Sequence, residues 1–197
     1  MEEDVWKKAK SNAANAMRNS DWVQWIHEGT GFATTQAERD LRIVWEALSG
    51  KKHCAVCMNL SGCCFPRNNM PEYPLHPNCH CKTEPIGAIT ATARCRESKV
   101  KGWIFNPSVP NGKKELFYEW GYSIIDKDWL ISEYIRQGKE KYERGDFTLH
   151  KLNEYGQQIN IIIELPRKDR IGTVTFTSGW MVYPNGVIEL VTGFGRR

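Results

Sequence analysis

The sequence predicts an α+β protein in two parts: a helical N-terminal module over residues 1–87 and a helix-plus-antiparallel-sheet domain over residues 99–197. Three observations lead to this prediction. Apolar residues recur at helical spacing in the first 50 residues. A segment rich in cysteine and proline follows, and near the C-terminus two alternating apolar runs flank Asn185-Gly186, a strong hairpin signal.

The strongest helix of the first part is predicted to begin at Thr35, which can form a capping box with Glu38, and to end at Gly50. Its apolar stripe, at i, i+3, i+4 and i+7, is Leu41, Val44, Trp45 and Leu48. Residues 51–86 carry many helix and strand breakers and little periodicity, so they need a source of order other than an apolar stripe. Residues 87–98 are predicted to be a linker or a short helix that marks the domain boundary.

In the second part, helices are predicted over residues 114–120 and 128–142, and Gly145 is predicted to end the second helix. The buried face of that helix is predicted to consist of Leu130, Ile131, Tyr134 and Ile135. Strands are predicted over residues 157–165, 172–183 and 187–192. With a further turn at residues 167–170, these three strands would form an antiparallel meander.

Six of the seven cysteines lie between Cys54 and Cys81. They form a Cys-x-x-Cys pair, an adjacent pair, and a closing His-Pro-Asn-Cys-His-Cys run. This spacing is typical of a zinc site, in which two ligands lie on a tight turn and a second pair follows after a loop. A redox role for the first pair is less favoured, because Cys54 does not follow a βαβ pattern.

The preferred ligand set is Cys54, Cys57, Cys79 and Cys81, with His76 as the alternative to one of the last two. Such a closed set of four ligands implies a structural zinc ion, since no coordination position remains for water. Of the adjacent pair Cys63 and Cys64, one is expected to be buried and the other spare.

The odd number of cysteines and their crowding into one segment argue against a secreted disulfide scaffold. No run is long and apolar enough to span a bilayer, and the N-terminus lacks a signal-peptide pattern. We therefore expect a protein of a reducing cytoplasm, without a membrane partner.

The paired motif from Cys54 to Cys57 and from His76 to Cys81 resembles the C-terminal signature of the phage head-morphogenesis family, the minor head proteins similar to the F protein of phage Mu. The resemblance covers residues 35–86. It implies a virion-associated protein near the portal, with portal or capsid proteins or DNA as partners and without enzymatic chemistry. The chain departs from the family in its shorter upstream region and in His80, where an arginine is usual.

The second half resembles a domain of unknown function that ends phage minor head proteins and bacterial polymorphic toxins. The residues that carry this resemblance include Trp103, Gly121, Trp129 and Trp180. Its order of helices before sheet is similar to that of compact ribonuclease toxins, so a ribonuclease-like effector acting on RNA is the alternative function. A phage accessory protein that binds a host factor is a third.

A metal-independent ribonuclease needs a general base and a cation for the phosphorane charge. The candidates are His150 as the base and Arg167 or Lys168 as the phosphate binder. A surface role is the more favoured interpretation of all three.

Basic residues cluster after the cysteine segment and can contact phosphates, although a solvated surface is favoured for a net charge of only +4. These residues are Arg94, Arg96, Lys99, Lys101, Lys113 and Lys114. The aromatic residues of the second half can stack on bases, but core packing is favoured. They include Trp103, Tyr118, Trp120, Tyr122, Trp129, Tyr134, Trp180 and Tyr183.

Overall fold

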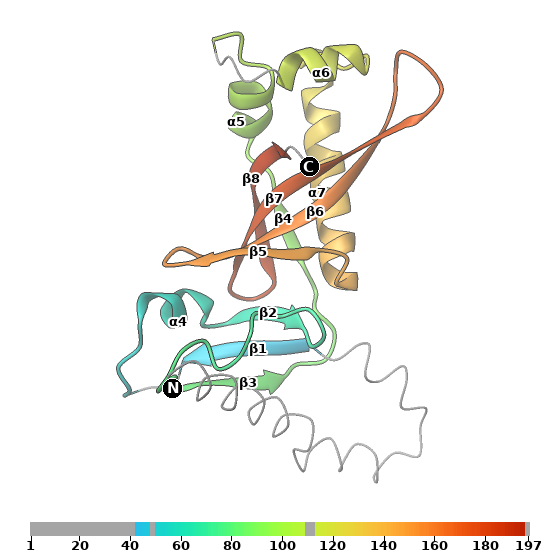
Figure 1. The fold of residues 1–197 in the computed structure, drawn as a ribbon. Coiled ribbons are helices and arrows are strands. Elements are labelled where there is room, and N and C mark those ends of the chain that lie inside the picture. Colours follow the sequence, from blue (N-terminus) through green and yellow to red (C-terminus); the bar gives the residue numbers. More distant parts are fainter. Residues whose placement is uncertain (1–41, 48–49, 109–112, 196–197) are drawn as a thin grey trace, which may run out of the picture.

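The computed structural model describes residues 42–47, 50–108 and 113–195, which form an α+β fold with two sheets (Figure 1). The predicted helices before residue 42, with the capping box of Thr35 and Glu38, lie outside the described residues. The strands are β1 (Arg42–Ala47), β2 (Cys63–Pro66), β3 (Cys81–Pro85), β4 (Thr92–Arg94), β5 (Thr148–Asn153), β6 (Gly156–Pro166), β7 (Thr173–Tyr183) and β8 (Val187–Gly195). The helices are α4 (Ala55–Leu60), α5 (Glu97–Lys99), η1 (Val100–Ile104), α6 (Lys113–Glu119), η2 (Ile124–Asp126) and α7 (Lys127–Arg144). None of the helices in these residues is long and apolar enough to cross a membrane.

The smaller sheet has the antiparallel order β2-β1-β3 and corrects one prediction. Residues 42–47, predicted to continue a helix, form its central strand β1. Ile43 and Trp45 are buried, whereas Glu46 is exposed, which is the two-residue period of a strand. The β-branched residues Ile43 and Val44 and the aromatic Trp45 favour a strand. Hydrogen bonds to β2 on one side and to β3 on the other stabilise this strand, although the apolar residues also have helical spacing.

Strands occur in residues 51–86, predicted to have few regular elements, and in residues 87–98, predicted to be a linker or a short helix. Residues 51–86 include α4, β2 and β3, and residues 87–98 include β4, which pairs in parallel with β8. Both strands of the first segment gain order by pairing with β1, a contact between residues distant in sequence. The predicted division into residues 1–87 and 99–197 stays a prediction.

The larger sheet has the order β4-β8-β7-β6-β5 and confirms the predicted antiparallel meander of β6, β7 and β8. Asn185 and Gly186 have φ values of 61° and 72°. Positive φ at both central residues is the requirement of the type I′ hairpin turn, which asparagine and glycine meet at little cost. The edge strand β5 was not predicted.

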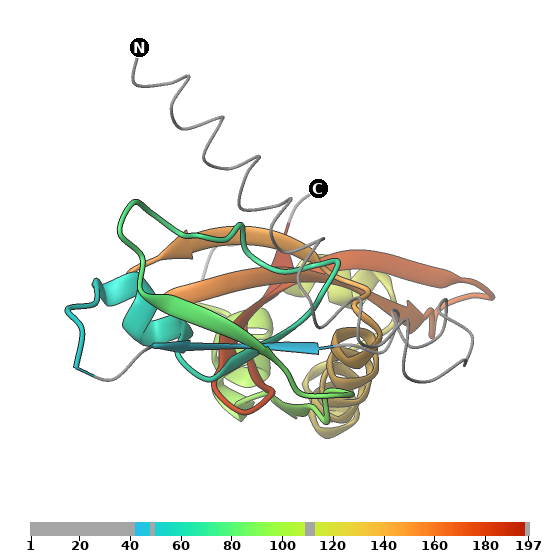
Figure 2. The same ribbon diagram turned by 90° about the horizontal axis from the view of Figure 1, so that it is seen from below.

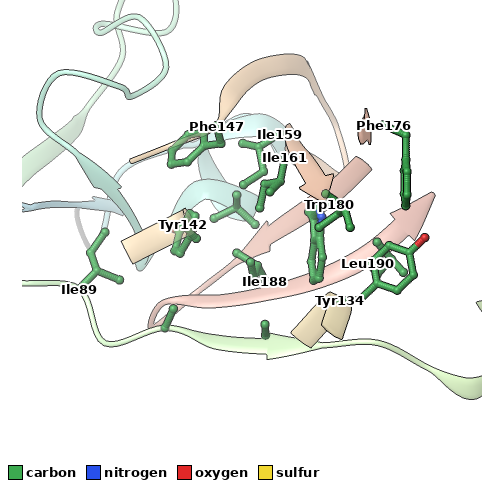
Figure 3. Packing of buried hydrophobic residues seen from close by; sticks show 14 of the residues in the cluster. Ile89, Tyr134, Tyr142, Phe147, Ile159, Ile161, Phe176, Trp180, Ile188 and Leu190 are labelled. Carbon is green, nitrogen blue, oxygen red and sulfur yellow. The ribbon is translucent and has the colours of Figure 1, made fainter. Parts of the chain in front are cut away.

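Helix α7 covers the apolar face of this sheet, which Figure 3 shows in close-up. The predicted helix over residues 128–142 is confirmed, and Gly145 ends α7 in the left-handed conformation with a φ of 78°. Leu130 and Tyr134 are buried as predicted, but Ile131 and Ile135 are only partly buried. Gly138 lies against Trp180, and a Cβ atom added to this glycine would come within 2.6 Å of the indole ring. The absence of a side chain at residue 138 therefore sets how closely α7 approaches β7.

The two sheets share one hydrophobic core. The hydroxyl of Tyr142 in α7 donates to the carbonyl oxygen of Cys64 in β2, and the amide of Asn69 donates to the carbonyl oxygen of Phe147 at 2.6 Å. Cys63 also forms a β-bridge with Pro184 at the β7–β8 turn. Figures 1 and 2 both place β2 beside this end of the larger sheet.

We expect Gly138→Ala to destabilise the protein although alanine favours a helix by about 1 kcal/mol over glycine. Overpacking against Trp180 costs about 1–3 kcal/mol, so the net loss of unfolding free energy should be up to about 2 kcal/mol in urea unfolding. Gly102→Ala is the matched control, because its nearest neighbour to an added Cβ is 3.9 Å away. Equal stability of the two variants would contradict this account of the helix–sheet contact.

Candidate metal centre

Helix α4 positions the first two candidate ligands. Cys54 is its N-cap residue, and the Cys54 Sγ accepts a hydrogen bond from the backbone N–H of Cys57 at 3.4 Å. An extended N-cap residue followed by one helical turn brings residues three apart to the same side of the chain. The Cys-x-x-Cys spacing therefore presents both sulfurs to one point.

A tight turn positions two further candidate ligands, His76 and Cys79. The backbone N–H of Cys79 donates to the carbonyl oxygen of His76 at 3.2 Å, and Asn78 has a φ of 57°. Proline in the second position and a residue with positive φ in the third are the features of a type II turn. Asparagine tolerates this conformation, so the His-Pro-Asn-Cys sequence folds His76 and Cys79 toward each other.

The candidate ligands from the two segments converge. The Nε2 atom of His76 lies 3.3 Å from the Sγ of Cys54 and 3.1 Å from the Sγ of Cys57. The sulfurs of Cys57 and Cys79 are 3.8 Å apart. Two groups, Cys54 with Cys57 and His76, and Cys57 with Cys79 and Cys81, each have all ligand atoms within 4.8 Å of one another. Cys57 belongs to both groups and is the centre of the cluster.

These spacings suit a metal ion and exclude a disulfide. Zinc bonds of about 2.3 Å to sulfur and 2.0–2.1 Å to nitrogen, at tetrahedral angles, place two sulfurs about 3.8 Å apart and a sulfur and a nitrogen about 3.5 Å apart. The Cys57–Cys79 distance matches the first value, and the His76 distances require a lengthening of a few tenths of an ångström. A disulfide needs about 2.05 Å, and all seven cysteines are free.

The tautomer of His76 also suits a metal ligand. Its Nδ1 lies 2.7 Å from the carbonyl oxygen of Pro77, which can only accept a hydrogen bond. Nδ1 therefore carries the proton, and Nε2 directs its lone pair toward the cysteines. A backbone carbonyl that fixes a ligating histidine in this way is common at metal sites.

The charges of the cluster favour a bound cation. Burial raises the pKa of the Cys57 thiol well above its usual range, and its hydrogen bonds with the neighbouring sulfurs raise that pKa further. The hydrogen bond from the Cys57 amide instead lowers the pKa of Cys54. A hydrogen bond with the Pro77 carbonyl raises the pKa of His76, as do the charges of Cys54 and Cys79. Crowded thiolates repel one another, so a divalent cation would stabilise the charged cluster and release protons when it binds.

The five candidate donors thus form two overlapping groups of three that share Cys57, whereas a tetrahedral ion needs four ligands. The four residues of the preferred set, Cys54, Cys57, Cys79 and Cys81, are divided between these two groups, and neither group contains all four. The alternative ligand His76 lies closer to Cys54 and Cys57 than the 3.8 Å that separates the sulfurs of Cys57 and Cys79. His76 is therefore as well placed as any cysteine of the second pair.

Tyr73 is a supporting residue that the sequence did not indicate. Its hydroxyl donates to the carbonyl oxygen of Cys81, and its ring packs edge-on against Trp45 with centroids 5.0 Å apart. Tyr73 thereby ties the loop that carries His76 to strands β1 and β3. Only the pairing of these strands brings Trp45 within reach, so the sequence offers no local signal for this role.

The remaining cysteines lie outside both groups. Cys63 and Cys64 are both buried in β2, so the expectation that one of them is spare is wrong. Burial raises the pKa of Cys63 to about 12, and burial likewise raises the pKa of Cys95 to about 12. These thiols stay protonated at neutral pH and act as small apolar side chains.

The structure does not bring the candidate catalytic residues together. His150 is exposed on β5, next to the pairing of Leu149 with Ile159, whereas Arg167 follows the far end of β6. Eight residues of extended chain separate Ile159 from Arg167, or about 26 Å at 3.3 Å per residue.

Both basic candidates have structural partners. Arg167 pairs with Asp169 at 2.8 Å and donates to the carbonyl oxygen of Glu119 at 2.9 Å. Lys168 pairs with Asp126 at 2.6 Å. These contacts fasten the β6–β7 turn to the segment after α6, and the catalytic role of the three residues stays a prediction.

Comparisons of the chain with protein-family models, with curated proteins and with solved structures found no match. The Cys/His cluster, compatible with metal binding, is therefore the basis for a functional conclusion.

We expect Cys57→Ala to abolish stoichiometric metal binding, because Cys57 contributes to both ligand groups. Cys95→Ala is the matched control, a partly buried thiol outside the groups that should leave binding unchanged. Metal content is measured by elemental analysis of the purified variants. Full metal content in Cys57→Ala, or its loss in Cys95→Ala, would contradict the proposed cluster.

Proposed function

We propose that this protein is a phage minor head protein, or another virion-associated protein, whose Cys/His cluster binds one structural zinc ion. The observation that supports the proposal is the convergence of both ends of the signature, Cys54–Cys57 and His76–Cys81, on one point. The signature suggests the family by resemblance. If both halves of the signature bind one metal ion, they must lie close together, as they do in this structure.

Zinc is the metal that this donor set favours. Thiolate and imidazole donors are soft or intermediate ligands, and four of them in tetrahedral array are typical of zinc. If four of the five candidate donors coordinate one ion, no position remains for a water ligand, so the ion would have a structural role.

The role of the ion follows from the segment that it would hold. Residues 67–80 join β2 to β3 without a helix or strand of their own. Coordination by His76 and Cys79 would fix this loop to α4 and present it as a rigid surface to portal or capsid proteins or to DNA. Metal binding supplies the free energy of ordering that a short loop cannot gain by apolar burial.

The ribonuclease alternative is less supported, because the described residues hold no arrangement of His150 with Arg167 or Lys168 that could serve one phosphate. A phage accessory protein that binds a host factor could have the same zinc site. The two functions are distinguished by whether the protein is present in assembled phage particles.

We expect the purified protein to contain about one zinc ion per chain. Removal by a strong chelator should abolish hydrogen-exchange protection in α4 and in the loop of residues 67–80, while β6–β8, whose hydrophobic cluster does not include the ligands, should keep their protection. Zinc should also leave as the pH falls, because protons compete with the metal for thiolate and imidazole. Unchanged protection after complete zinc removal would contradict a structural role.

We expect the chain to be detected by immunoblotting in purified particles of the phage whose genome encodes it. Cys57→Ala should lower the yield of DNA-filled particles relative to Cys95→Ala, because only the first variant loses a ligand. RNA incubated with the protein should stay intact. Cleavage of RNA that His150→Ala abolishes would instead support the ribonuclease function, and absence from particles would contradict the virion role.

A further inference from the structure

Two aromatic side chains that the sequence assigned to the core are exposed near the α5–α6 end of the molecule. Trp103 is 43% and Tyr118 is 51% exposed, whereas Trp180, predicted to be buried, is fully so. Single exposed rings are common on protein surfaces, so the significance of these two depends on the charged residues around them.

Lysines surround these rings. Lys99 and Trp103 lie four residues apart in the continuous helical run of α5 and η1, so they share one side of it. The Nζ atom of Lys113 in α6 lies 5.1 Å from the centroid of the Trp103 ring. Tyr118 is also in α6, and its ring is 6.0 Å from that of Phe105, the residue after η1.

We name the set Lys99, Trp103, Lys113 and Tyr118 the aromatic–lysine surface. Figure 1 shows α5 and α6 at the end of the molecule opposite the sheet that carries the cysteines. The surface is therefore separate from the candidate metal centre.

The nearby carboxylates do not cancel the charge of this surface: Glu97 and Glu115 pair with lysines outside it, and Glu119, which follows Tyr118 in α6, is one negative charge against two lysines. Glu97 pairs with Lys127 at 3.2 Å, and Glu115 pairs with Lys114 at 3.6 Å. Within the described part of the chain, Lys99 forms no ion pair with a carboxylate. Positive charge beside exposed rings is suited to a ligand that has both negative charge and flat apolar faces.

We propose that the aromatic–lysine surface binds single-stranded nucleic acid, with bases stacked on Trp103 and Tyr118 and phosphates held by the lysines. Stacking on an aromatic ring is open to every base of a single strand, whereas the bases of a duplex are already stacked on one another. An acidic peptide would pair with the lysines but would make no use of the rings. The aromatic residues thus select the single strand, and the lysines supply affinity.

The test is fluorescence anisotropy of a labelled 15-nucleotide oligothymidine titrated with the full-length protein. Trp103→Ala and Tyr118→Ala should each weaken binding by about 5- to 150-fold, the range of a base–aromatic stack. Tyr155→Ala, which removes a 69% exposed ring at the β5–β6 turn, is the matched control and should leave binding unchanged. If Trp103→Ala does not fold, Trp103→Leu removes the ring while it keeps an apolar side chain.

The contribution of Lys99 is tested by the salt dependence of the same titration. Replacement of Lys99 by alanine should reduce the slope of log affinity against log salt concentration by about 0.7, the value for one phosphate of a single strand left unneutralised. Lys151→Ala on β5 is the matched control and should leave the slope unchanged.

Three outcomes would overturn the proposal: no binding at moderate salt, equal affinity for a duplex of the same length, or indifference of binding to both aromatic substitutions. Displacement of the oligonucleotide by polyglutamate at equal charge concentration would point instead to an acidic protein partner. The proposal is independent of the zinc site, since Cys57→Ala should not alter oligothymidine binding if the larger sheet stays folded.

Discussion

The approach of helix α7 to the larger sheet is the constraint on which the rest of the structure depends. Gly138 removes the side chain that would keep α7 away from Trp180. At this close separation, Tyr142 near the end of the same helix reaches the carbonyl oxygen of Cys64 in β2. The smaller sheet is thereby fixed to the larger one, and its strands in turn carry Cys81 and support the loop that holds His76.

The candidate metal centre and the aromatic–lysine surface obtain their order from different sources. The loop that carries His76 and Cys79 has no apolar core of its own, so it needs the ligands and Tyr73 to hold it. Trp103 and Tyr118, by contrast, project from helices whose other faces are buried through Val100, Ile104 and Phe117. Under both proposals, one hydrophobic core would support a metal-held loop that binds other virion proteins and a separate surface that binds nucleic acid.

Prediction from the sequence succeeded where a local signal and the tertiary structure agree. The Asn185-Gly186 turn, the helix ending at Gly145 and the alternating residues of β6 to β8 each have a local cause, either positive φ or burial of one face. Prediction failed at β1, because Val44 and Trp45 satisfy a helical stripe and a strand almost equally well in a short window. Hydrogen bonds from two flanking strands, both distant in sequence, decided between them.

The sequence by itself identified the candidate donors of the metal centre, because Cys-x-x-Cys and His-Pro-Asn-Cys each fold locally into a turn that presents two donors. It also determined the meander of β6, β7 and β8. Only the tertiary structure decided that Cys63 and Cys64 are both core residues, that Trp103 and Tyr118 are exposed, and that His150 lies far from Arg167. These properties depend on which distant elements pack together, and burial by a distant neighbour leaves no periodic signal in a short stretch of sequence.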